Sequence, residues 1–403
     1  MKKKVRVRKK IKPLGFIILI VIILLVVGMV GLLSKFSSKP TKNELLIFKE
    51  VGKVPKLQSF DMVMVGDALI HYGVYRDAKT SDGGYDFKPM LENMKPIISK
   101  YDLAYYNQET ILGGTELGLS SYPMFNSPYE VGDAFIDCGF DVVSLATNHT
   151  MDKGEKGVLN SVAYWKNHPE IVTSGQWASE EERNEPKVYE KNGIKYAFFS
   201  YTMWNNGLKT PAGKSYLSNE YSQEKAKADI EQVRDKVDVV IVAMHWGTEY
   251  SLGVSAAQEQ EADYLSSIGV DLIIGAHPHV VEPMEYINDG KTFVIYSLGN
   301  FISDQDGVER LTGLMAEVSI LKLENIDGTT SSFVVNPKAE LVYTGAHRPG
   351  NAYNSNFKLY TYSSLDDTIL PGYQNYYAKY KGVVSSRYPE LQWGLSKEWV
   401  RWR

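Results

Sequence analysis

The sequence has 403 residues, of which 44% are hydrophobic and 12% aromatic. This length and apolar content exclude disorder over most of the chain and allow one large domain or two ordinary ones. The first twelve positions hold eight of the 44 basic residues and no acidic residue, so residues 13–403 carry 36 basic against 48 acidic residues, a net charge of −12. Because a net-negative chain is a poor general binder of nucleic acid, we expect no nucleic-acid partner. Cys138 is the only cysteine, which excludes an internal disulfide.

An uncharged apolar segment follows the basic start of the chain. Residues 14–34 read LGFIILIVIILLVVGMVGLLS, which at about 1.5 Å per residue is long enough to cross a bilayer core of about 30 Å. A cleavable signal peptide is the alternative, but its apolar region is usually shorter and ends at a small-residue cleavage site. We therefore predict a basic cytoplasmic tail over residues 1–13 and a transmembrane signal anchor over residues 14–34, with the bilayer as its partner. Positive charge stays on the cytoplasmic side, so we expect a single-pass protein of the cell membrane whose C-terminal domain is extracellular.

Residues 35–57 are rich in Lys, Ser and Pro and predict a linker. Beyond it, apolar β-rich runs alternate with amphipathic stretches, which predicts an α/β domain with largely buried strands. The expected strands are 60–66, 103–107, 141–146, 196–202, 238–245, 271–277 and 292–299, and the expected helices are 87–100, 128–138, 156–168, 222–237 and 256–269. Residues 346–403, rich in Asn and Tyr, predict a C-terminal extension.

Six of the expected strands are followed by polar side chains at their C-terminal ends. In α/β sheets these ends form the crevice in which ligands bind, so we expect the side chains to lie close together. The set comprises Asp67, His71, Asn107, Glu109, Asn148, His149, His245, His277, His279 and Asn300. The two remaining histidines, His168 and His347, are expected to be exposed or locally hydrogen-bonded.

This set of side chains predicts a metal site. Buried imidazoles and carboxylates need partners, because unpaired buried polar groups are costly, and a divalent cation satisfies several of them at once. Nitrogen and oxygen ligands without a thiolate suit Mn, Zn or Fe, and we expect two divalent ions, which together can activate water for attack on an ester. Taken singly, Asp67 is explained as a strand-end cap, and Asn148 and Asn300 as turn residues. Six coincidences at the same kind of position favour the metal site.

Six segments in this order resemble one known family: VGDALIH, NQET, ATNHTMDKG, HWGTEY, GAHPHVVEPME and YSLGNFISD. They resemble the CapA/PgsA family of bacterial capsule and poly-γ-glutamate synthesis proteins, which is similar to the calcineurin-like metallophosphoesterases. The resemblance covers roughly residues 58–345. It implies a four-layer α/β/β/α sandwich around a two-metal site, tethered to the membrane and facing outward.

The resemblance implies a role for most of the polar side chains. Asp67 and Glu109 are implied to be metal-ligating carboxylates, with Glu109 as the bridge, and Asn148 is implied to be a further ligand. The metal set is completed by His245, His277 and His279.

Catalytic roles are implied for His149, Asp67 and His71, with His149 contacting a phosphoryl-like oxygen. His71 lies four residues after Asp67, whereas phosphoesterases have a D-x-H motif at this place. We expect the substrate-binding residues to be Asn300, Trp246 and Glu249, with packing as the alternative explanation for Trp246.

The resemblance favours a membrane-anchored capsule-biosynthesis protein that helps to make, export or attach an anionic polymer such as poly-γ-glutamate. Two alternatives remain open from the sequence. The chain is an active two-metal phosphoesterase on a cell-envelope phosphate ester, or it is a non-catalytic subunit that binds the polymer or contacts membrane synthase subunits.

Overall fold

The computed structural model describes residues 56–325, 328–350 and 352–397. The predicted cytoplasmic tail, the predicted transmembrane segment at residues 14–34 and nearly all of the predicted linker lie outside these residues. Within the described part of the chain, no helix combines the length and the apolar character needed to cross a membrane.

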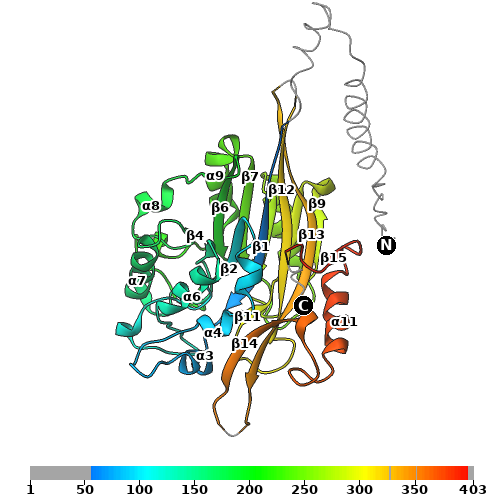
Figure 1. Cartoon of the computed structure of the whole chain (residues 1–403). Helices are drawn as coiled ribbons and strands as arrows, with labels where there is room; N and C mark the ends of the chain where they lie inside the picture. Colours follow the sequence, from blue (N-terminus) through cyan, green and yellow to red (C-terminus); the bar gives the residue numbers. More distant parts are fainter. Residues whose placement is uncertain (1–55, 326–327, 351, 398–403) are drawn as a thin grey trace, which may run out of the picture. The chain divides into compact units, whose positions relative to one another are not determined.

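The first sheet has nine strands, in the order β14-β13-β12-β1-β2-β3-β4, with β11 beside β1 and β15 beside β13 (Figure 1). β1 pairs in parallel with β2 and antiparallel with β12, so the sheet is mixed. The strands are β1 (Lys56–Ala68), β2 (Leu103–Asn107), β3 (Val142–Ser144), β4 (Val172–Ser174), β11 (Asn300–Ile302), β12 (Thr312–Glu324), β13 (Thr330–His347), β14 (Ser355–Thr361) and β15 (Gln392–Trp393).

The second sheet has six strands in the order β5-β6-β7-β8-β10-β9. Its four middle strands are parallel, and antiparallel strands β5 and β9 close the two edges. The strands are β5 (Tyr189–Lys191), β6 (Ile194–Thr202), β7 (Val239–His245), β8 (Leu272–Ala276), β9 (Met284–Ile287) and β10 (Thr292–Ile295). The expected α/β class is therefore confirmed, with two mixed sheets.

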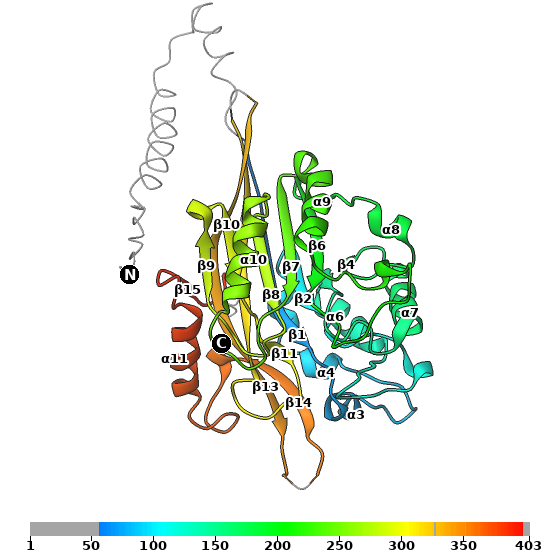
Figure 2. The same ribbon diagram turned by 180° about the vertical axis from the view of Figure 1, so that it is seen from behind.

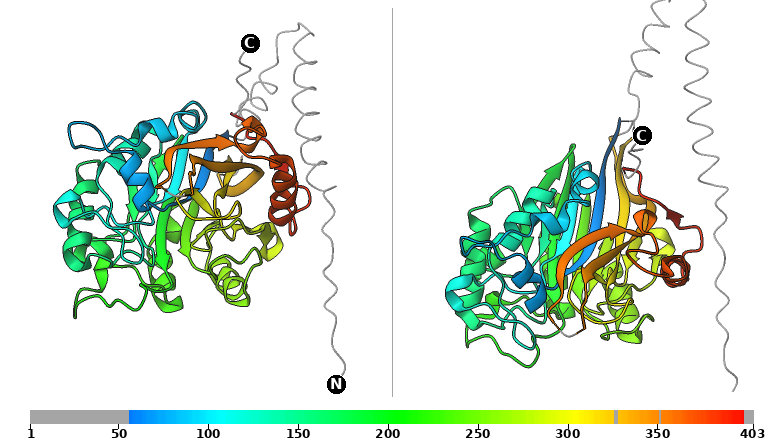
Figure 3. Two further views of the ribbon diagram at one scale, coloured as in Figure 1. Left: turned by 90° about the horizontal axis from the view of Figure 1, so that it is seen from below. Right: turned by 60° about the horizontal axis from the view of Figure 1, so that its bottom comes forward.

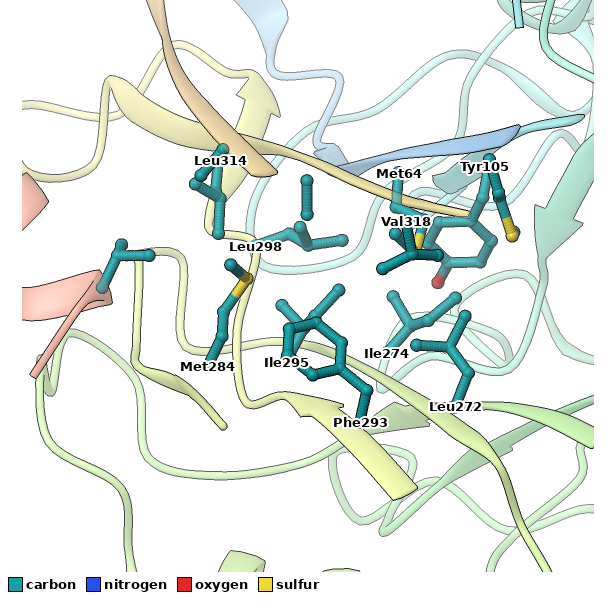
Figure 4. Close-up of a cluster of buried hydrophobic side chains, with 14 of the residues drawn as sticks. Met64, Tyr105, Leu272, Ile274, Met284, Phe293, Ile295, Leu298, Leu314 and Val318 are labelled. Carbon is teal, nitrogen blue, oxygen red and sulfur yellow. The ribbon is translucent and has the colours of Figure 1, made fainter. Parts of the chain in front are cut away.

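The main hydrophobic core lies between the two sheets. Figure 4 shows Met64 and Tyr105 of the first sheet with Ile274, Phe293 and Ile295 of the second sheet in this layer, and all five side chains are buried. Side chains alternate along a strand, so the residues between them face outward and need a second cover.

Helices provide that cover on the outer face of each sheet (Figures 2 and 3). The first sheet is covered by α3 (Tyr72–Asp77), α4 (Lys88–Leu91), α5 (Lys95–Ile98), α6 (Glu130–Cys138) and α7 (Gly154–Lys166), and the second by α9 (Gln223–Val233) and α10 (Ala256–Ser267). A short α8 (Glu180–Asn184) and the 3-10 turns η1 (Thr115–Leu117), η2 (Ser215–Leu217), η3 (Arg234–Lys236) and η4 (Asn288–Gly290) lie in the connections. The layers thus follow the order helices, first sheet, second sheet, helices.

The single helix expected over residues 87–100 is wrong. The structure has two four-residue helices, α4 and α5, each with a proline in its first turn, Pro89 and Pro96. Proline has no N–H to donate and clashes with the preceding turn, so Pro96 starts a new helix and cannot continue the first one.

Residues beyond 346 join the first sheet. β14 pairs with β13 along its length, and β15 adds a short parallel pairing to β13. Between them lie η5 (Tyr362–Ser364) and α11 (Tyr373–Val384), and the buried Tyr362, Tyr380 and Val384 belong to the core between the sheets. The predicted C-terminal extension therefore contributes to the packing of the domain.

The strands β1 and β11 meet at two glycines. A Cβ on Gly66 would lie 1.7 Å from the carbonyl oxygen of Gly299, which accepts a hydrogen bond from the N–H of Asp67 at 2.9 Å. Gly299 has a φ of +62°, in the left-handed region that glycine adopts freely. This close approach sets the register that places Asp67 opposite Asn300.

We expect Gly66→Ala to destabilise the domain by about 1–3 kcal/mol, because the added methyl group forces β1 and β11 apart in a packed region. The measurement is the free energy of unfolding in urea. Gly253→Ala is the matched control, since a Cβ at Gly253 meets no atom within 4 Å. Equal stability of the two variants would contradict the assigned register.

Candidate metal centre

Eight of the predicted side chains come together at the C-terminal ends of strands from both sheets. Each of the eight has at most 5% of its surface exposed. The first sheet supplies Asp67, Glu109, Asn148, His149 and Asn300, and the second sheet supplies His245, His277 and His279.

Two groups of potential ligands share one carboxylate. Asp67, Glu109 and His279 form one group, and Glu109, His245 and His277 form the other, with ligand atoms within 4.8 Å of one another in each group. The Glu109 Oε1 atom lies 3.6 Å from His279 Nε2 and 4.0 Å from His245 Nε2. Glu109 therefore lies between the two ligand groups and belongs to both.

Amide side chains hold the ligands in place. Asn107 donates a hydrogen bond to Asp67 Oδ1 at 2.9 Å, which orients this carboxylate. The Asn148 Oδ1 atom lies 2.9 Å from His245 Nε2, and the Asn300 Oδ1 atom lies 3.1 Å from His279 Nδ1. Such contacts fix the rings that face the centre and add two amide oxygens to the donor set.

The electrostatics of the group favour a cation. Burial, followed by the charge of Asp67, raises the pKa of Glu109 well above its ordinary value. Burial, followed by neighbouring histidines, lowers the pKa of His245 well below its ordinary value and that of His277 to about 3. The lowered pKa values keep the imidazoles neutral, as metal ligands must be, and a cation beside Glu109 would favour its ionised form.

Several polar atoms in the centre are buried without a hydrogen-bond partner. They are both carboxylate oxygens of Glu109 and the Nδ1 atoms of His245 and His277. Buried polar atoms are nearly always paired, so this concentration at one point calls for a ligand. The atoms are N and O donors that suit Mn, Zn or Fe, and the residues present fit a divalent metal site.

The turn after β8 holds its two histidines in an unusual backbone conformation. His277 has a φ of +99° and His279 a φ of +60°, both in the left-handed region. Residues other than glycine occupy this region at a cost of about 1–3 kcal/mol and do so mainly at functional sites. The turn brings the two rings to 5.8 Å from each other and toward Glu109, which explains the spacing of the GAHPH segment.

His149 lies beside the ligand groups and forms a pair with Asp152. The His149 Nδ1 atom is 2.7 Å from Asp152 Oδ2, which also accepts a hydrogen bond from the backbone N–H of Phe125 at 2.6 Å. The Phe125 ring packs edge-on against His149, with ring centres 4.7 Å apart. His149 is thereby held with its Nε2 atom left for another group.

His71 stands at the edge of the centre and belongs to none of the three-residue ligand groups. Its Nδ1 atom lies 3.1 Å from the carbonyl oxygen of Leu69 and accepts a hydrogen bond from the N–H of Asp304 at 3.3 Å. Burial, followed by the charge of His279, lowers the pKa of His71 to about 4. A neutral His71 can accept or donate one hydrogen bond near the centre.

The structure changes the predicted set of substrate-binding residues. Trp246 does not face the centre: it is 1% exposed, packs in the core under α10 and donates its indole N–H to the Tyr296 carbonyl oxygen at 2.9 Å. The packing explanation therefore applies to Trp246, because successive residues of a strand point to opposite faces and His245 faces the centre. Glu249 is exposed and lies within ligand distance of His277 and His279.

Two aromatic residues that the sequence analysis missed lie against the histidines. The Trp204 ring is 4.9 Å from His277, and the Tyr250 ring is 6.0 Å from His279, measured between ring centres. Trp204 lies two residues after the end of the predicted strand 196–202, so its position near a strand end was a usable signal. Tyr250 lies in a loop that no periodicity describes.

Comparison with known proteins identifies related sequences. The family model described as "Bacterial capsule synthesis protein PGA_cap" matches residues 61–305. The chain is 34% identical over 179 residues to a protein of Bacillus subtilis (strain 168) named "PGA biosynthesis protein CapA", covering 42% of this chain and 44% of that one. It is 29% identical over 182 residues to the "Capsule biosynthesis protein CapA" of Bacillus anthracis, covering 44% and 43%. The match spans less than half the length of these relatives.

Solved structures show distant likeness. A phosphatase from Mycoplasma pneumoniae matches 71% of this chain and 94% of its own, with 15% identity and a TM-score of 0.44. The calcineurin-like phosphoesterase YfkN from Bacillus subtilis matches 71% and 91%, with 16% identity and a TM-score of 0.43. Both TM-scores lie below 0.5, so these structures do not identify the chemistry of the site.

We expect Glu109→Gln to remove most of the stabilisation that metal gives the protein. At a metal concentration 100 times the dissociation constant, the natural protein should gain about 2.7 kcal/mol, and the variant less than about 1 kcal/mol. Without metal, the variant should be the more stable of the two at pH 7. The reason is that a carboxyl group with a raised pKa loses folded-state stability as the pH rises above its ordinary value.

The measurement is urea unfolding with Mn²⁺ or Zn²⁺ and with a chelator. Glu92→Gln is the control, since Glu92 pairs with Lys358 at the surface and should change stability by less than about 1 kcal/mol. Full metal stabilisation of Glu109→Gln would contradict the bridging role.

Proposed function

Because this chain belongs to the bacterial capsule synthesis protein PGA_cap family, we propose that it acts in the synthesis, export or anchoring of an anionic capsule polymer such as poly-γ-glutamate. The observation that carries the proposal is the pair of buried ligand groups that share Glu109. The printed names of the two Bacillus relatives point to the same process. A chain that only bridged other proteins would have no need for this buried set of donors.

The proposal includes a site for divalent metal, with two ions. Asp67, Glu109 and His279 would hold one ion, and Glu109, His245 and His277 would hold the other, assisted by Asn148. When bound, such metals supply a positive charge that polarises a carbonyl or phosphoryl oxygen of a substrate. Asn300 and Glu249 line the same centre and are assigned to substrate positioning.

The location proposed for the protein rests on the sequence. The basic tail and the uncharged run over residues 14–34 support a single crossing of the cell membrane, with the N-terminus inside and the domain outside. Membrane synthase subunits and the polymer itself are the partners that fit this location.

A second candidate function is hydrolysis of a phosphate ester of the cell envelope, and the His149–Asp152 pair favours it. The Nδ1–H group of His149 donates a hydrogen bond to the Asp152 carboxylate, so the Nε2 atom faces a substrate oxygen. In its doubly protonated form, with the positive charge stabilised by Asp152, His149 can donate its Nε2 proton to a leaving group, a role that contributes about 10²–10⁴-fold to a rate. A subunit that only bound polymer would gain nothing from this pair.

The capsule role is tested by replacing both histidines of the turn after β8. We expect His277→Ala with His279→Ala to lower the amount of cell-bound polymer at least ten-fold, because both ligand groups lose a member. The measurement is polymer mass per cell in the producing organism, with circular dichroism of the purified variant as the check of folding. His168→Ala is the control, since its ring pairs with surface carboxylates. Normal polymer in the double variant would remove the metal centre from the capsule role.

The hydrolytic candidate predicts a loss of activity in Asp152→Asn. An amide of the same shape keeps the oxygen that contacts Phe125 and His149 but lacks the negative charge that stabilises a protonated His149, so kcat for bis(p-nitrophenyl) phosphate should fall about 10²-fold or more. Bound metal, measured by elemental analysis, should stay unchanged. Unchanged kcat, or absence of activity in the natural protein with metal, would leave polymer binding as the function.

A further inference from the structure

We propose that Tyr250 and Arg310 form a second anion subsite beside the metal centre, which holds the next free carboxylate of an acidic polymer. This inference rests on the proposed function and names a recognition element for its substrate. The two residues are far apart in the sequence and lie in different loops. They meet at the edge of the centre, where the Arg310 guanidinium carbon lies 5.0 Å from the centre of the Tyr250 ring.

Tyr250 is fixed against the histidine turn. Its backbone N–H donates a hydrogen bond of 2.8 Å to the carbonyl oxygen of Pro278, the residue between His277 and His279. Its φ is +64°, a left-handed conformation that tyrosine adopts at a cost, and 47% of its surface is exposed. A strained, half-exposed aromatic residue does little for the core, so its placement beside the centre indicates contact with a ligand.

Arg310 is fixed from the other side of the centre. Its carbonyl oxygen accepts a hydrogen bond of 2.8 Å from the side chain of Asn300, whose Oδ1 atom lies 3.1 Å from His279 Nδ1. Asn300 also donates to Gln305 Oε1 at 2.9 Å, and Gln305 donates to the Tyr250 hydroxyl at 3.4 Å. The same amide that touches a metal ligand therefore positions both members of the proposed subsite.

The positive charge of the Arg310 guanidinium is only weakly paired within the described residues. Its ion pair among the described residues is with the neighbouring Glu309 at 3.9 Å, a long contact between two part-exposed side chains that contributes little. Stacking on the Tyr250 ring leaves the edge of the planar group, with its N–H donors, for a carboxylate. An acidic polymer that approaches residues 13–403, whose net charge is −12, needs such local positive charge in addition to the metal.

The metal centre and the Tyr250–Arg310 subsite together suit a polymer with regularly repeated carboxylates. In a γ-linked glutamate chain every residue carries one free carboxylate, so one carboxylate at the metal centre leaves the next one nearby on the same chain. Free glutamate also has two carboxylates, but the spacer between them is shorter than the spacer between successive free carboxylates of the γ-linked chain, so we expect it to fill only the position at the metal centre. The subsite therefore discriminates between oligomer and monomer, and it acts through charge-assisted hydrogen bonds.

The test measures binding to the full chain in detergent, loaded with Mn²⁺, by titration calorimetry. The probes are a synthetic γ-linked glutamate pentamer and free glutamate. We expect Arg310→Gln to weaken pentamer binding about ten-fold and to change glutamate binding less than two-fold, with bound metal unchanged. Arg310→Lys should recover part of the loss, and Lys227→Gln, an exposed cation on α9, should bind both probes as the natural protein does.

The outcomes separate the inference from the proposed function. Pentamer affinity that is unchanged in Arg310→Gln overturns the subsite alone, as does an equal loss for pentamer and glutamate. A natural protein that holds Mn²⁺ but does not bind the pentamer overturns the proposed polymer and the subsite with it. If Arg310→Gln loses metal, the Arg310→Lys variant decides: retained metal with the full loss of pentamer affinity overturns recognition by charge.

Discussion

The carboxylate of Glu109 is the group on which the rest of the site depends. It is buried, both of its oxygens lack hydrogen-bond partners, and it lies between the histidines of two ligand groups. Burial and the nearby Asp67 make the negative charge of Glu109 unfavourable, so this carboxylate lowers the stability of the metal-free domain. A cation reverses that sign, since it pairs with Glu109 and Asp67 together. Metal binding at this centre would thus be linked to folding through one side chain.

The packing of the two sheets positions the centre. The first sheet supplies Asp67, Glu109 and the amides, and the second sheet supplies the three ligand histidines, so each of the two groups that share Glu109 needs both sheets. The core between them, which includes Met64 and Phe293, fixes their separation, and the contact of Gly66 with Gly299 fixes the register of Asp67. Dense packing resists small shifts, which suits a site whose donors must stay within a few ångströms of each other.

The sequence predicted the strand ends well, because short apolar runs followed by polar residues mark both a buried strand and its end. It failed where a side chain's direction or a loop's course decides the outcome. For Trp246 the sequence left substrate binding and packing open, and the alternation of side chains along β7 from His245 decides for packing. Tyr250 was missed because its backbone conformation, with φ of +64°, has no counterpart in a hydrophobic pattern. The helix expected over residues 87–100 failed at Pro96, where local backbone chemistry overrides periodicity.

β1 also determines how the domain responds to force. The chain enters at Lys56 and runs along one strand to Asp67, a distance of roughly 36 Å at about 3.3 Å per residue. Residues from Lys56 to Met64 pair continuously with β12. Tension between whatever holds the start of the chain and a polymer gripped at the centre would act parallel to β1. The hydrogen bonds between β1 and β12 would then be loaded in shear, all at the same time, and would not break one after another. This arrangement would let the domain keep hold of the proposed polymer under tension.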